Sequence, residues 1–201
     1  MAGPRTVVLI PESTRKRPGG VRIAGDRDVA RALPAAARAD LEGLRAEVRR
    51  VSGTGIAWNE LLPACERFDG NMYRHIPEEA WESRDQGVEV LIASGLLGLV
   101  ASRDPVPRYD HSMAESTPPF GKLNRWWHSR GLPRILGAYL EAIRPALVVD
   151  LLSLEYREAV TGYEGDLAGI EVRRIDFPGL GRASQPRRGE AVARILRTGK
   201  A

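Results

Sequence analysis

The residues best suited to chemistry follow two apolar stretches of the sequence. The first stretch, 88–92, runs into a Ser-Gly pair and then into a polar segment. The pair and the segment supply Ser94, Gly95, Asp104, Arg108 and Tyr109. The second stretch, 147–152, contains Asp150 and is followed by Ser153 and Tyr156. Strands that deliver glycine and charged residues at their carboxyl ends are typical of binding sites in α/β proteins. A core strand followed by a solvated loop explains either stretch alone equally well.

A basic turn follows the first predicted strand, 6–10. It carries Ser13 and Lys16 ahead of a glycine pair at 19–20. Backbone N–H groups and cations in such a turn can hold a phosphate or a carboxylate. The glycine patterns of the Walker loop and of the dinucleotide-binding fold are both absent from the sequence.

The polar groups expected to converge mix cations, carboxyls and hydroxyls. The candidates for catalysis are Ser94, Asp104, Tyr109 and Asp150. Either aspartate could act as a general base or as a nucleophile. The candidates for ligand binding are Ser13, Lys16, Asn71, Tyr73, Gly95, Arg108, Lys122, Trp127, Ser153 and Tyr156. This set suits an anionic or nucleotide-like ligand, with cations for phosphate, hydroxyls for orientation and a tryptophan for stacking.

The segment 120–128 interleaves basic and aromatic residues, which can pair phosphates and stack bases. On a helix, however, Leu123, Trp126 and Trp127 would form one apolar stripe. Such a stripe faces the core more often than a ligand, so we favour the core for the tryptophans.

The elements that must position these residues alternate between strands and helices. Strands are predicted near 6–10, 88–93, 147–152 and 170–175, the last at a sheet edge. Helices are predicted at 28–33, 35–51, from Asn59 through Phe68, from Pro77, at 132–143 and at 189–196. We therefore predict a single α/β domain spanning 1–201, with a mixed, largely central sheet flanked by helices.

The end of the chain is basic. From Arg173 onward, eight Arg and Lys face two acids. Candidate contacts to nucleic acid are Arg182, Arg187 and Arg188. The segment 175–183 matches the P-G-x-G hairpin that presents backbone N–H groups to a phosphate, but we expect Pro186 to interrupt the helix that should follow. A solvated basic tail is the simpler alternative.

Composition excludes several classes of protein. The single cysteine, Cys65, excludes an internal disulfide framework and suits a reducing compartment. No apolar run approaches the length of a membrane span, so we predict a soluble cytoplasmic protein. Three scattered histidines give no metal-ligand spacing. No cofactor is evident, and the sequence does not indicate an oligomeric state.

Several motifs resemble the YaaA family of bacterial peroxide-stress proteins. The family's L-P-P-S-E-x-K turn appears as LIPESTRK, with Glu12 and Thr14 where the family has proline and glutamate. Its S-G-L-[YW]-G segment appears at 94–98 with leucine in place of the aromatic residue. Its V-x-D-L-x-S-x-x-Y segment is intact at 149–156.

Two further segments extend the resemblance. The stretch 102–113 keeps Asp104, Pro107, Tyr109 and Met113 of the family pattern. Asp110 stands where the family has arginine, and Arg108 could supply the missing positive charge. The sequence LNRWWH resembles the family's L-x-x-F-W segment. The similarity covers most of 6–160, and beyond it the chain looks shorter than the family.

The resemblance implies a family-specific α/β fold, protection against hydrogen peroxide through control of free iron and DNA damage, and DNA binding through a helix-hairpin-helix. The altered charges at positions 14 and 110 leave open a different role, an enzyme that acts on a nucleotide or another small anionic metabolite. A pure interaction module is the third possibility, supported only by the basic end of the chain. DNA or a nucleotide-like anion is therefore the expected partner, and a membrane is not.

Overall fold

A five-stranded sheet forms the centre of the computed structural model, which describes residues 5–21, 28–51 and 55–201. The strand order is β4 (Gly98–Ala101), β3 (Val88–Ser94), β1 (Thr6–Pro11), β8 (Leu147–Asp150) and β9 (Glu171–Arg174). Neighbours pair in parallel except β4, which is antiparallel to β3. The predicted mixed α/β architecture is confirmed, and β9 lies at the predicted edge.

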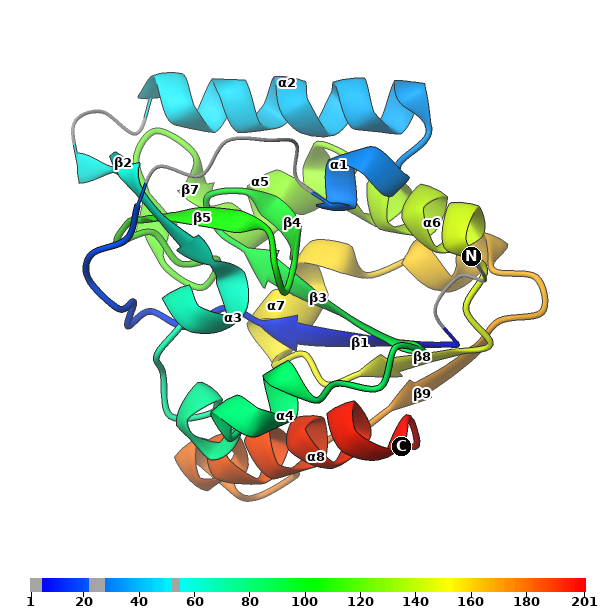
Figure 1. Ribbon diagram of the computed structural model, residues 1–201. Coiled ribbons are helices and arrows are strands. Elements are labelled where there is room, and N and C mark those ends of the chain that lie inside the picture. Colours follow the sequence, from blue (N-terminus) through cyan, green and yellow to red (C-terminus); the bar gives the residue numbers. More distant parts are fainter. Residues whose placement is uncertain (1–4, 22–27, 52–54) are drawn as a thin grey trace.

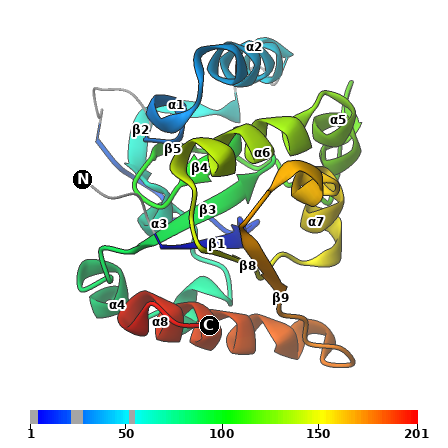
Figure 2. The same ribbon diagram turned by 90° about the vertical axis from the view of Figure 1, so that its right-hand side faces the viewer.

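Helices cover both faces of the sheet (Figures 1 and 2). One face carries η2 (Tyr73–His75), α4 (Glu78–Glu82) and α8 (Ser184–Thr198). The other face carries α5 (Leu123–Ser129), α6 (Leu132–Ile143) and α7 (Leu154–Val160). Farther out lie α1 (Asp28–Ala32) and α2 (Ala35–Val51), and α2 packs on α6.

The remaining elements are short. An antiparallel ribbon joins β2 (Ala57–Pro63) to β5 (Pro105–Arg108), and another joins β6 (Ser116–Thr117) to β7 (Gly121–Lys122). Single turns of helix form α3 (Ala64–Arg67), η3 (Tyr163–Asp166) and η4 (Gly181–Ala183). Within the described part of the chain, no helix has the length and apolar character needed to cross a membrane.

The core is made of the residues that the apolar patterns single out. All six residues of β1 are buried, as a strand with parallel neighbours on both sides requires. Leu41, Leu44 and Val48 form the buried face of α2, as predicted. Trp127 is completely buried, which confirms the core assignment of this tryptophan.

One helix prediction is wrong, and the last predicted helix is confirmed with different bounds. The segment from Asn59 is not a helix, because residues 57–63 pair with β5 and Pro63 then forms the N-cap of the single-turn α3. Pairing with a distant segment thus overrides the local pattern. The last helix spans 184–198 instead of 189–196 and runs through Pro186 without interruption. Proline is tolerated there because N–H groups of the first turn have no partner within the helix.

Candidate functional site

The polar ends of the strands meet through loops at the carboxyl edge of the sheet. β1 lies between β3 and β8, so the two predicted clusters are not on adjacent strands. The loop after β5 closes this distance, because the hydroxyls of Ser112 and Tyr156 lie 3.2 Å apart. The predicted convergence therefore occurs for part of the set, with the end of β1 at its centre.

A buried carboxylate sits at that centre. The side chain of Glu12 is fully buried; Oε1 accepts a hydrogen bond of 2.7 Å from the backbone N–H of Gly95, and Oε2 accepts one from the Tyr109 hydroxyl. That hydroxyl also lies 2.7 Å from the Oγ of Ser94. Burial raises the pKa of Glu12, although Lys16, Tyr109 and backbone N–H groups oppose the rise.

Lys16 completes this buried network. Its ammonium lies 3.9 Å from Oε2 of Glu12 and 3.9 Å from the centroid of the Tyr109 ring. It donates to the carbonyl oxygens of Ser13 at 3.0 Å and His111 at 3.3 Å. Burial lowers the pKa of Lys16, and Glu12 opposes the shift. The lysine thus fastens the turn after β1 to the 109–113 loop.

The Glu12 position was not among the predicted site residues. The available signal was an acid directly after a fully apolar strand, at the position where the related family has proline. Because a buried carboxylate needs donors around it, that acid required a polar environment at the sheet edge. Ser94, Tyr109 and Lys16 were predicted as site residues, and the structure brings them together around Glu12.

An open cleft of about 490 Å³ lies over this network, and we call it the sheet-edge cleft. Five predicted ligand-binding residues line it: Ser13, Asn71, Tyr73, Ser153 and Tyr156. Some of these side chains have internal partners. The Ser13 hydroxyl accepts from the N–H of Gly70 at 3.1 Å, and the Tyr73 hydroxyl donates to the carbonyl of Pro11 at 2.9 Å.

Two arginines also line the sheet-edge cleft: Arg182 from η4, the turn before the last helix, and Arg188 from the first part of α8. Arg188 is only 4% exposed. Its Nε and Nη1 are buried and have no hydrogen-bond partner among the described residues. Its guanidinium lies 5.6 Å from the centroid of the Phe177 ring. Burial lowers the pKa of Arg188, and Arg157 adds to the shift while Asp176 opposes it.

The two aspartates that were candidates for catalysis lie outside the cleft. Asp104 is completely buried and accepts a 3.0 Å hydrogen bond from the N–H of Ala101. Asp150 is also completely buried, accepts from the N–H of Leu152 at 2.9 Å and pairs with Arg157 at 2.8 Å. Such contacts stabilise a buried carboxylate within the fold, so both aspartates have a structural role.

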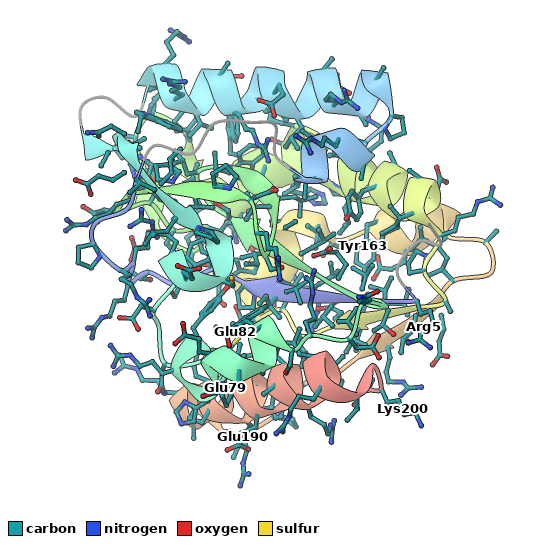
Figure 3. All side chains as sticks on the ribbon, in the orientation of Figure 1. Arg5, Glu79, Glu82, Tyr163, Glu190 and Lys200 are labelled. Atoms are coloured by element: carbon teal, nitrogen blue, oxygen red, sulfur yellow. The ribbon has the colours of Figure 1, made fainter. Side chains whose placement is uncertain are left out.

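Four more candidates lie away from the cleft. Trp127 is in the core, where its indole N–H donates to the Gly95 carbonyl at 2.8 Å. Arg108 and Lys122 are exposed on the two small ribbons. Arg187 pairs with Glu190 at 3.1 Å, and Figure 3 shows Glu190 directed away from the body of the protein.

The hairpin at 175–183 does not join two helices. It connects β9 to η4, which continues directly into α8. A strand therefore stands where the first helix of a helix-hairpin-helix would be. Gly181 and Ser184, at the end of this segment, line the sheet-edge cleft.

A second cavity, of about 450 Å³, lies on the other side of the Phe68–Tyr73 segment and is lined by Cys65 and Trp81 among others. Burial raises the pKa of the Cys65 thiol to about 11. Only about one thiol in ten thousand is then ionised at pH 7. Since the thiolate is the reactive form, Cys65 is a poor direct target for peroxide.

This property of Cys65 can be measured by alkylation with iodoacetamide over a range of pH. We expect the alkylation rate of the native protein to rise with pH, with a midpoint at a pH of about 11. In the urea-unfolded chain the midpoint should lie near 9.0, the ordinary pKa of the thiol. A native midpoint at or below 9.0 would show an activated thiol instead.

No group of three or more His, Cys, Asp or Glu side chains that could hold a metal ion occurs in the part of the chain that the structure describes. The arrangement at the sheet edge is instead suited to an anion. It combines a buried guanidinium with few partners, a helix N-terminus and neutral hydroxyl and amide groups.

Comparison with known proteins identifies a family and a relative. Residues 36–179 match the family described as peroxide stress protein YaaA. The UPF0246 protein SCO2297 of Streptomyces coelicolor is 30% identical over 186 residues, which cover 89% of this chain and 67% of that protein.

Proposed function

Because the chain belongs to the peroxide stress protein YaaA family, we propose that it acts in peroxide stress by binding DNA, with the sheet-edge cleft as its phosphate contact. The observation that carries the proposal is Arg188. A buried guanidinium with two nitrogens that lack a hydrogen-bond partner among the described residues is costly in a folded protein. A phosphate oxygen in the cleft would supply the missing acceptor and remove that cost.

The surroundings of Arg188 support an anionic partner. The positive end of the α8 dipole and the preceding turn line the same cleft. Arg15 and Arg182 add exposed cations at its rim, although Asp69 pairs with Arg15 at 3.0 Å. Two carboxylates, Glu12 and Glu155, also line the cleft. Glu12 is buried, and the exposed Glu155 accepts from the Ser153 hydroxyl at 3.2 Å. Cations thus exceed exposed acids around the cleft.

The alternative role as a nucleotide-processing enzyme has less support. Asp104 and Asp150 are both occupied by internal contacts away from the cleft. Ser94 and Tyr109 are buried beneath it and hydrogen-bonded to each other, and the Tyr109 hydroxyl also donates to Glu12. A reacting group would have to displace these contacts to reach any of the four candidates.

The experiment measures binding of a short fluorescein-labelled DNA by anisotropy at several salt concentrations. We expect Arg188→Met to weaken binding about tenfold, which corresponds to the loss of one charge-assisted hydrogen bond. The slope of log K against log salt should become shallower by about 0.9, the value for one phosphate contact. The melting temperature of Arg188→Met should stay equal or rise, because Nε and Nη1 of the buried guanidinium have no hydrogen-bond partner among the described residues.

Arg134→Met is the matched control. Arg134 is exposed on α6, on the opposite face of the sheet, and pairs with Asp40 at 2.8 Å. Its removal should leave affinity and salt slope unchanged. Equal DNA binding by wild type and Arg188→Met, or no DNA binding by the wild type, would contradict the proposal.

A further inference from the structure

The depth of Arg188 restricts which phosphate can reach it. Proteins that bind a continuous duplex present exposed cations to phosphates that are flanked by a sugar on both sides. Arg188 is instead 4% exposed, at the side of a cleft of about 490 Å³. A phosphate at a strand end has a sugar on one side only, so its free oxygens can enter such a cleft first.

We propose that the sheet-edge cleft receives the terminal phosphate monoester of a nucleic-acid strand end, in preference to the phosphodiesters of a continuous strand. This inference rests on the proposed DNA-binding function. It assigns Arg188 the role of the end-recognising cation and leaves the exposed Arg15 and Arg182 to contact the adjoining backbone.

Charge favours the monoester. A terminal phosphate carries about −1.5 to −2 charges at pH 7, against one for a diester. It also offers three free oxygens where a diester offers two, so a parallel contact of two oxygens with a guanidinium leaves a third for another donor. For a buried cation such as Arg188, the larger charge gives the larger gain, because a poorly hydrated site screens the attraction less.

The other groups of the cleft fit the same ligand. The amide side chains of Asn71 and Gln185 line the cleft and make no side-chain hydrogen bond within the described residues. They can donate to phosphate or sugar oxygens.

The cleft volume is also within the range of single small-molecule sites, about 300–1,000 Å³. This volume suits one nucleotide and not a groove-spanning duplex. Radical cleavage of deoxyribose leaves phosphate at the broken ends, which accords with a peroxide-stress family.

The test compares one short oligonucleotide with a 5′-phosphate, a 3′-phosphate or hydroxyl ends, each bound to the full-length protein and followed by anisotropy. We expect one phosphorylated form to bind about tenfold more tightly than the hydroxyl form. The preference should disappear in Arg188→Met. It should persist in Arg187→Met, since Arg187 neighbours Arg188 in sequence but pairs with Glu190 at 3.1 Å and does not line the cleft.

Competition with the matching nucleoside monophosphate separates the two possible sources of a phosphate monoester. A strand-end site requires that the mononucleotide compete far more weakly than the phosphorylated oligonucleotide. Equal competition would identify a free nucleotide as the ligand and overturn the strand-end assignment.

The remaining outcomes separate this inference from the proposed function. Equal affinity for phosphorylated and hydroxyl ends, with weaker binding of both by Arg188→Met, would overturn end recognition and leave DNA binding at the cleft intact. A preference that survives in Arg188→Met would place end recognition elsewhere. No binding of any oligonucleotide would overturn both.

Discussion

Replacing Glu12 with alanine should lower the free energy of unfolding by about 3–5 kcal/mol, the usual result when one partner of a buried ion pair is removed. The substitution leaves the ammonium of Lys16 buried without its carboxylate. It also removes the acceptor of the Gly95 N–H and of the Tyr109 hydroxyl. Urea denaturation at neutral pH measures the loss.

Glu12→Gln should cost less than Glu12→Ala. Burial raises the pKa of Glu12 and thereby favours the neutral acid, to which glutamine is similar in shape and polarity. Glu141→Ala is the control, because Glu141 is exposed on α6, and its loss should change stability by no more than about 0.5 kcal/mol. A loss for Glu12→Ala as small as for Glu141→Ala would show that the network does not stabilise the fold.

The pH dependence of stability gives a second readout for Glu12. Its pKa is raised above 4.5, so the native state holds this proton more tightly than the unfolded chain. Stability therefore falls as the pH rises from the ordinary value of 4.5 towards the raised native value. Glu12→Gln should remove this acid-side decline. The lowered pKa of Lys16 acts in the alkaline range, where stability rises as the pH approaches 10.5.

Gly189→Ala should destabilise the protein by about 3 kcal/mol, because the added methyl group would clash with backbone atoms, which cannot move aside as a flexible side chain can. A Cβ at this position would lie 2.3 Å from the carbonyl oxygen of Met72 and 2.8 Å from the Cβ of His75. Helix α8 must then move away from η2. Since α8 carries Arg188 and η2 adjoins Asn71, the sheet-edge cleft should also widen and DNA affinity should fall.

Gly43→Ala in α2 is the matched control for Gly189→Ala. A Cβ on Gly43 meets no atom within 4 Å. Alanine in an exposed helix interior should therefore raise stability by about 0.5–1 kcal/mol. Thermal and urea unfolding of the two variants should thus shift in opposite directions. A Gly189→Ala variant as stable as wild type would show that α8 is not held closely against η2.

The three inner strands of the sheet were the most predictable part of the fold. The run 7–10 is continuous and apolar because a strand in the middle of a parallel sheet is buried on both faces. The helix predicted from Asn59 was wrong because the segment 57–63 pairs with β5, which lies more than forty residues further along the chain. Local periodicity contains no information on such a pairing.

The candidate site was predictable in location and less so in membership. The rule that strand ends gather polar side chains pointed to Ser13, Ser153 and Tyr156, and all three line the sheet-edge cleft. It could not separate a functional acid from a paired one, since Asp150 and Arg157 become partners only through the turn into α7. Arg108 and Lys122 lie on ribbons whose direction depends on tertiary pairing.

Arg188 illustrates the remaining limit. The sequence marked it as one of several basic residues near the end of the chain, equivalent to Arg187. The helical period separates the two, since consecutive residues on a helix point in different directions. Once α8 docks on η2, Arg188 becomes buried beside the cleft and Arg187 remains exposed.

Binding of a phosphate in the sheet-edge cleft is tested most directly by a crystal structure of the protein with a short phosphorylated DNA strand. We expect a phosphate in the cleft, within hydrogen-bond distance of the Arg188 guanidinium. DNA bound on another face, with the cleft empty of phosphate and the Nε and Nη1 of Arg188 still without an acceptor, would contradict it.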